Sequence, residues 1–201
     1  MQDDDFCYDL KPRDPEKENT LTGKLLLAMP SMGDPRFSRA VIFICAHDEN
    51  GAMGIVLNHP LEGVALTELF EQLEIDSDPA NDEIPVMSGG PVEKARGFIL
   101  HTKEFRQEDT VDIDEEFAVT GTIDALKAIA TGEGPKQMLF ALGYAGWSAG
   151  QLDEEMHHNA WLVVDPDKAI VFDVEPEDRW EKAINKLGIE PGMLSSESGR
   201  A

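Results

Sequence analysis

The sequence predicts an α+β fold, in which one mixed and largely antiparallel sheet carries flanking helices. Hairpin and helix patterns are interspersed, without the steady strand–helix–strand alternation of a doubly wound parallel sheet. The dipeptide Asn50-Gly51 lies between two apolar runs, Val41 to Cys45 and Ala52 to Leu57, which is typical of a β-hairpin. At 201 residues with 41% hydrophobic content, the chain suits a single domain with a proper core.

The composition argues against nucleic-acid and membrane partners. The chain has 40 acidic and 17 basic residues, a formal net charge of −23, which repels phosphate backbones and anionic lipids. No apolar run approaches the roughly 18 residues that a membrane span needs, and the acidic start lacks the pattern of a signal peptide. Cys45, inside an apolar run, is expected to be a small buried hydrophobe and not half of a disulfide. We therefore expect a cytoplasmic protein.

The chain is expected to begin with a flexible acidic leader over residues 1–20, which contain prolines and no apolar period. The folded domain covers residues 21–194, and residues 195–201 are expected to form a flexible tail. Phe117 to Thr120 is expected to be an edge strand. Together, short apolar or alternating runs predict the strands Lys24–Met29, Val41–Cys45, Ala52–Leu57, Ile84–Met87, Gly97–His101, Phe117–Thr120 and Gln137–Leu142.

Helical spacing and turn chemistry organise the rest of the domain. The turn at Asp165 to Lys168 predicts a second hairpin, which joins Trp161–Val164 to Ala169–Val174. The helix near residue 122 has Thr122 as its N-cap and ends before Gly132. Apolar residues three and four apart predict helices over Leu66–Leu73, where about three turns are expected, over Thr122–Ala130 and over Pro176–Gly188.

The glycine-rich stretch from Gly143 to Asp165 holds a match to a catalytic signature, Gly146-Trp147-Ser148-Ala149-Gly150. In α/β-hydrolases this pattern exposes a nucleophilic serine on a turn between a strand and a helix. That fold also needs an acid and then a histidine downstream, and His157 and His158 follow the serine too closely. Other histidines serve only in a different topology: they are His47, His59 and His101.

Helix capping explains the same residues in a simpler way. Ser148 and Gln151 have the spacing of a capping box, and Trp147 and Leu152 that of a hydrophobic staple. Ser148 is therefore expected to cap a helix, and its role as a catalytic nucleophile is an alternative.

The same stretch and a nearby basic segment offer candidate ligand-binding residues. A strand–loop–helix junction presents free N–H groups to an anion, although these glycines match neither a dinucleotide fingerprint nor a P-loop and favour tight packing instead. Arg36 and Arg39, close to Ser31–Asp34, could hold an acidic ligand or pair with the chain's many carboxylates. The candidates are Gly143, Gly146, Trp147, Ser148, Gly150, Arg36 and Arg39.

We expect neither a metal nor a cofactor. Glu154 and His157 have the spacing of a helical metal-ligand pair, but a di-iron site needs this motif twice, with further carboxylates. A histidine at the negative end of a helix dipole accounts for His157 and His158 without a metal.

Several motifs together resemble the AlgH/YqgE family of bacterial proteins, and the resemblance runs from about Leu21 to Ser198. It rests on Thr22-Gly23 with Leu25 to Asp34 (LLLAMPSMGD), Gly54 to Pro60 (GIVLNHP), Gly89 to Val92 (GGPV), Gly97 to His101 (GFILH) and Gly143 to Asp153 (GYAGWSAGQLD). The resemblance implies a compact cytoplasmic protein with a mostly antiparallel, barrel-like central sheet. It implies no reaction, cofactor or catalytic residue, and one branch of the family is named for transcriptional regulation.

We therefore favour a non-catalytic regulatory or interaction protein, whose partner is a protein or a small ligand. A hydrolase that uses Ser148 is one alternative. Direct nucleic-acid binding is the other, and it needs a patch made from the bases Arg36, Arg39, Lys94, Arg96, Lys103 and Arg106.

Overall fold

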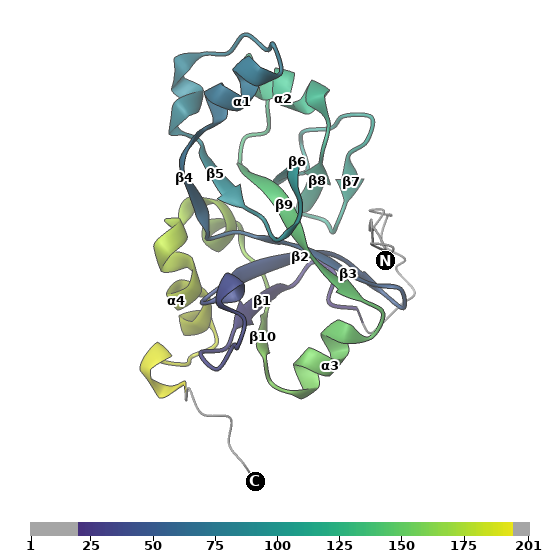
Figure 1. The fold of residues 1–201 in the computed structure, drawn as a ribbon, viewed down its shortest axis with the longest axis vertical. Coiled ribbons are helices and arrows are strands. Elements are labelled where there is room, and N and C mark those ends of the chain that lie inside the picture. The colour runs from purple at the N-terminus through teal and green to yellow at the C-terminus, as the bar shows by residue number, and fades with distance from the viewer. Residues whose placement is uncertain (1–19, 195–201) are drawn as a thin grey trace, which may run out of the picture.

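The computed structural model describes residues 20–194, which form one curled sheet with helices packed around it (Figure 1). The predicted tail and, apart from Thr20, the predicted leader lie outside these residues. The strands are β1 (Leu25–Ala28), β2 (Val41–Asp48), β3 (Gly51–Val56), β4 (Pro60–Ala65), β5 (Pro85–Ser88), β6 (Val92–Thr102), β7 (Val111–Asp112), β8 (Phe117–Thr120), β9 (Met138–Ser148) and β10 (Trp161–Val164). The helices are η1 (Pro35–Phe37), α1 (Leu66–Gln72), η2 (Pro79–Glu83), α2 (Ile123–Ala130), α3 (Gln151–His157), η3 (Ala169–Asp173), α4 (Pro176–Lys186) and η4 (Pro191–Met193).

The strand order is β10-β1-β2-β3-β9-β6-β8-β7, and these neighbours are antiparallel. β5 pairs with β9 in parallel and with β4 antiparallel. The predicted α+β class with a mixed, mostly antiparallel sheet is thus confirmed. The hairpin at Asn50-Gly51 is confirmed too, since Asp48 faces Gly51 across the turn.

Both faces of the sheet are buried, which explains the continuous apolar runs in β1 and β2. Leu25, Leu27 and Phe43 point into a core that α4 and η3 cover, whereas Leu26 and Ile42 point into a second core beside α3. A third core lies between α1, α2 and the strands β5, β6 and β9. Cys45 is 2% exposed, as expected for a small buried hydrophobe.

β9 is the strand on which the sheet is centred (Figure 1). Its first half pairs with β5 and β6, and its second half pairs with β3. The prediction that this strand ends at Leu142 is wrong: the backbone turns at Gly143, where φ is +75°, and continues as strand to Ser148. A positive φ suits glycine, so the strand passes the glycine without ending there.

The predicted strand over Ala169–Val174 is wrong, because η3 is a π-helix and β10 pairs with β1 instead. The Asp167 carboxylate accepts a hydrogen bond from the Ile170 N–H at 2.9 Å and starts a helical turn. The Val174 N–H donates to the Ala169 carbonyl, five residues back. The turn buries Ile170 and Val171 in the first core.

The remaining differences concern the ends and edges of elements. α1 is shorter than predicted, and Leu73 follows it with 42% of its surface exposed. β4 was not predicted, and β7 lies outside β8, which is therefore not the edge strand. The cap of α2 is confirmed, since the Thr122 hydroxyl accepts from the Ala125 N–H. In the described part of the chain, no helix is long and apolar enough to cross a bilayer.

Candidate functional site

Glycines allow the segment after β5 to pass directly against β9. The Gly89 N–H donates to the Leu142 carbonyl at 2.8 Å, and the Gly89 carbonyl accepts from the Val56 N–H at 2.9 Å. A Cβ atom on Gly89 would lie 2.2 Å from the Gly143 carbonyl oxygen. The backbone contact leaves no room for side chains, and it holds residues 88–91 beside β3.

Asn58 connects the end of β3 to the segment after η1. Its side-chain oxygen accepts from the Val41 N–H, and its NH₂ donates to the Arg39 carbonyl, both at 2.8 Å. The side chain is 9% exposed, so these bonds satisfy an amide that burial would otherwise leave unpaired. The next residue, His59, has its Nε2 3.1 Å from the Ser38 carbonyl oxygen. The sequence motif Asn58-His59-Pro60 thus brings η1 against the start of β4.

These two arrangements form a small cavity, which we call the basic cleft, with a volume of about 100 Å³. It is lined by Arg36, Phe37, Val56, His59, Ser88, Gly90, Pro91 and Lys94. Two of the motifs that carry the resemblance supply lining residues, namely His59 from one and Gly90-Pro91 from the other, and Arg36 follows closely after a third motif that ends at Asp34.

The basic cleft carries positive charge in a strongly acidic chain. Arg36 binds the Asp34 carboxylate through Nη2 at 2.6 Å and Nε at 3.0 Å, and the hydrogen bond from this side chain lowers the pKa of Asp34. Burial lowers the pKa of His59, and its bond to the Ser38 carbonyl opposes this shift. Within residues 20–194, no hydrogen bond or ion pair holds the Lys94 ammonium. Lys94 is therefore free to bind an incoming anion.

The structure places Ser148 at the exposed end of β9, and it is not the N-cap of α3. That position belongs to Gly150, whose φ of +73° suits glycine. The Gln151 side chain still accepts from the Ser148 N–H at 3.0 Å, which is one half of the predicted capping box. The Ser148 hydroxyl donates to the same Gln151 oxygen at 3.2 Å.

In the part of the chain that the structure describes, no imidazole bonds to the Ser148 hydroxyl. His47 accepts the Leu21 N–H at Nδ1, and its Nε2 lies 3.9 Å from an Asp153 oxygen. The buried His101 uses both ring nitrogens, with the Thr102 carbonyl and the Thr120 hydroxyl. The rings of His157 and His158 bond through Nδ1 to carbonyls four residues earlier.

Trp147, another predicted ligand-binding residue, is a buried core residue. Its indole N–H donates to the Glu155 carboxylate at 2.9 Å, and the indole of Trp161 donates to the same oxygen at 2.7 Å. The two rings meet edge to face, with centroids 6.0 Å apart. Trp147 and Leu152 share the second core, but with Gly150 as the N-cap they are not the N′ and N4 residues of the predicted hydrophobic staple.

The predicted candidates therefore do not gather in one place. Gly143, Gly146 and Gly150 belong to β9 and to the start of α3, and they do not line the basic cleft. The Arg39 guanidinium pairs with Glu181 and lies 4.6 Å from the centre of the Trp180 ring. Only Arg36 lines the basic cleft. The sequence did not predict that His59, Ser88 and Lys94 line the same cleft as Arg36, although two of the quoted motifs contribute residues to this cleft.

The described bases do not form a free positive face. Five of the six bases that a nucleic-acid patch would need pair with carboxylates, and Lys94 is the sixth. The pairs are Arg36–Asp34, Arg39–Glu181, Arg96–Glu93, Lys103–Asp112 and Arg106–Asp112. No three His, Cys, Asp or Glu side chains between residues 20 and 194 come together as a metal site.

Comparisons with known proteins agree with the resemblance. The family described as AlgH-like matches residues 25–192. A UPF0301 protein from Jannaschia sp. is 50% identical over 189 residues, 93% of this chain and 98% of its own. The solution structure of the AlgH protein from Pseudomonas aeruginosa is 41% identical with a TM-score of 0.76, and the match covers 95% of this chain and 100% of that one. A Corynebacterium diphtheriae protein shares the fold at 20% identity and a TM-score of 0.66, over 94% of this chain and 95% of that one.

Proposed function

This chain belongs to the AlgH-like family, and from that premise we propose that it is a non-catalytic interaction protein. The basic cleft receives an acidic group of a protein partner. The observation that carries the proposal is the Lys94 ammonium, which no described carboxylate neutralises although the chain has a net charge of −23. The Lys136 and Lys182 ammonium groups are also left without a salt bridge among the described residues, but of these three lysines only Lys94 lines the basic cleft.

The size of the basic cleft favours a single anionic group over a whole metabolite. Its volume is about 100 Å³, and liquid water occupies about 30 Å³ per molecule, so the cleft holds roughly three waters. A carboxylate fits this space, whereas drug-sized ligands fill pockets of about 300 Å³ or more. The rest of the partner would lie on the surface outside the cleft.

The donors around the basic cleft suit a carboxylate. Lys94 supplies a mobile ammonium, and Arg36 supplies a guanidinium whose fork already binds a carboxylate, that of Asp34. An incoming carboxylate can compete for Arg36 while it pairs with Lys94. Charge-assisted hydrogen bonds of this kind are stronger than neutral ones.

Direct nucleic-acid binding has less support. A duplex attracts proteins that offer several unpaired bases along one face. Here the other candidate bases are engaged by carboxylates, and the acidic surface repels phosphates. The hydrolase alternative also has less support, because the Ser148 hydroxyl bonds to Gln151 and a nucleophile needs an adjacent base.

NMR titration of the ¹⁵N-labelled chain with a tetraglutamate peptide tests the proposal. We expect the amide signals of Ser88, Gly90 and Lys94 to shift, and Lys94→Glu to abolish the shifts. Lys182→Glu is the matched control, because Lys182 is an exposed lysine on α4 that does not line the cleft. Equal loss in both variants, or shifts produced by inorganic phosphate and not by the peptide, would contradict a carboxylate site.

A further inference from the structure

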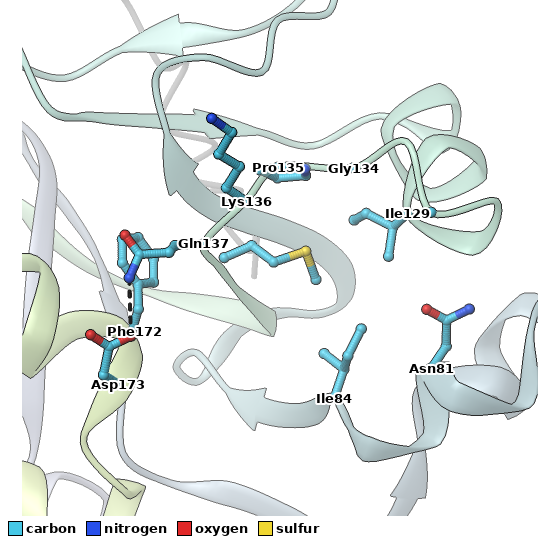
Figure 2. Close-up of a pocket in the computed structure, with 11 residues that line it drawn as sticks. Asn81, Ile84, Ile129, Gly134, Pro135, Lys136, Gln137, Phe172 and Asp173 are labelled. Atoms are coloured by element: carbon cyan, nitrogen blue, oxygen red, sulfur yellow. Dashed lines mark hydrogen bonds between the residues drawn. The ribbon is translucent and has the colours of Figure 1, made fainter.

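A second and larger cavity, which shares no lining residue with the basic cleft, lies between α2, η2, η3 and the start of β9. Its volume is about 380 Å³, within the range of small-molecule sites. It is lined by Asn81, Ile84, Ile129, Gly132, Gly134, Pro135, Lys136, Gln137, Met138, Phe172 and Asp173 (Figure 2). We call it the acceptor cavity, because the Asn81 amide oxygen and the Asp173 carboxylate on its two sides are hydrogen-bond acceptors.

Asn81 presents an unused acceptor to this cavity. The side chain is 8% exposed, and its NH₂ donates to the Asp78 carbonyl at 3.0 Å and the Ala130 carbonyl at 3.3 Å. Carbonyl oxygens only accept, so these two bonds fix which end of the amide is nitrogen. The amide oxygen is left without a partner among the described residues. The oxygen is accessible to solvent, because among the described residues the buried side-chain atom without a partner is Arg179 Nε. An accessible acceptor of this kind can bond to a ligand or to water.

Asp173 supplies a negative charge on the opposite side of the cavity (Figure 2). One carboxylate oxygen accepts from the Gln137 amide at 3.0 Å, and no lysine or arginine of residues 20–194 forms a salt bridge with it. The side chain of Lys136 is directed away from Asn81 and Ile84 (Figure 2). The backbone N–H of Lys136 donates to the Glu104 carboxylate at 2.8 Å. The cavity therefore has a charged acceptor at one side and a neutral acceptor at the other.

The wall between these acceptors is apolar. Phe172 packs against the first core, whereas Ile84, Ile129 and Met138 belong to the third core, so the cavity lies where two cores meet. Phe172 and Asp173 both reach it from the π-helix η3, whose five-residue turn places adjacent side chains there.

We propose that the acceptor cavity binds a small organic ammonium compound with an apolar body and a second hydrogen-bond donor. The ammonium pairs with Asp173, the body lies against Phe172 and Met138, and the second donor bonds to the Asn81 oxygen. The net charge of −23 raises the local concentration of cations around the chain. The site is independent of the basic cleft and takes the opposite charge.

Tyramine is the probe, because it joins an ammonium, an aromatic body and a phenolic O–H. NMR titration of the wild-type chain should shift the amides of Asn81, Gly134 and Asp173. Phenethylamine, which lacks the hydroxyl, should bind more weakly, as should 4-ethylphenol, which lacks the ammonium. 3-(4-Hydroxyphenyl)propionate replaces the ammonium with a carboxylate and should not bind. No response to tyramine, or equal binding of the anionic analogue, overturns the proposal.

A pair of variants separates the local charge from the overall charge. Asp173→Asn should weaken tyramine binding by up to about fivefold, the upper end of the range for an exposed ion pair. Asp109→Asn removes the same charge from an exposed loop outside the cavity and should leave binding unchanged. The same loss in both variants would show attraction to the overall charge only and would overturn the site. Asp173 is exposed, so its amide variant should fold, and the variant's own NMR spectrum checks this.

Discussion

Gly90 lies directly on the backbone of Tyr144: a Cβ atom on Gly90 would come within 2.1 Å of the Tyr144 carbonyl carbon. Tyr144 is 1% exposed and pairs with Val92 across the sheet, so it cannot move away without disturbing β6. The contact joins the segment after β5 to the second half of β9. This close backbone contact holds the segment that forms one wall of the basic cleft.

Gly90→Ala is expected to destabilise the chain by about 3 kcal/mol, because overpacking is added to an unfavourable positive φ. Urea denaturation measures the free energy of unfolding. Gly132→Ala is the matched control: φ is +79° there, and an added Cβ would meet nothing within 4 Å. That variant should lose only about 1 kcal/mol. Equal losses in the two variants would show that the close contact does not matter.

The Glu155 carboxylate accepts from two largely buried indole N–H groups, those of Trp147 and Trp161. Glu155→Leu leaves both donors unpaired and is expected to cost about 2–6 kcal/mol, at roughly 1–3 kcal/mol for each buried donor. Thermal unfolding followed by tryptophan fluorescence measures the loss. Glu154→Leu, an exposed change on the same helix, should be nearly neutral. A small effect of Glu155→Leu would mean that water satisfies the two indoles.

His101 makes stability depend on pH. Its ring is fully buried, and burial lowers its pKa below the ordinary value of 6.5. The unfolded chain therefore binds a proton more readily than the folded chain, so stability falls as pH decreases through about 6.5. His101→Gln should make the dependence between pH 6.5 and 5 shallower by up to about 1.4 kcal/mol per pH unit.

Urea denaturation at several pH values measures this dependence. His157→Gln, which changes an exposed histidine on α3, is the control and should keep the wild-type slope. The pKa of His59 is also lowered by burial, so part of the dependence should remain in His101→Gln. An unchanged slope in His101→Gln would assign the acid sensitivity to other groups.

Ser148 is expected not to react with a fluorophosphonate probe. Its hydroxyl donates to Gln151, and no described histidine is bonded to it; without a base, a serine is a weak nucleophile. Intact mass spectrometry detects the adduct, and Ser148→Ala identifies its position. Stoichiometric labelling that disappears in Ser148→Ala would contradict this expectation and support the hydrolase alternative.

Local patterns predicted the elements whose causes lie close together in the chain. The hairpin at Asn50-Gly51 and the cap at Thr122 each depend on a few neighbouring residues, and both were found. The prediction of a strand over Ala169–Val174 was wrong. Five apolar residues are too few for their spacing to distinguish a strand from a helix, and the Asp167 carboxylate starts a helical turn there. The prediction that Ser148 is the N-cap was also wrong, because Gly150, two residues later, takes the left-handed conformation and occupies that position.

The two cavities depend on contacts between distant segments, which periodicity does not report. The basic cleft needs Gly89 and Gly90 to meet β9, and Asn58 to hold the carbonyl of Arg39. The two motifs that contain His59 and Gly90-Pro91 each supply residues to the basic cleft, but the sequence does not show that these two segments face each other. The acceptor cavity forms between η2, α2 and η3, which no sequence motif linked.

The central position of β9 has a consequence for synthesis on the ribosome. β3, β5 and β6 precede β9 in the chain by many residues, yet each takes β9 as a neighbour. The edges of β3, β5 and β6 that pair with β9 therefore stay unpaired in the nascent chain until residue 148 has left the exit tunnel. One edge of β1 stays unpaired until residue 164, the end of β10, has also emerged. Sheets assembled from such non-local pairs close slowly, and exposed edges invite association with other chains. The strongly acidic character of the emerging polypeptide repels its neighbours through this interval.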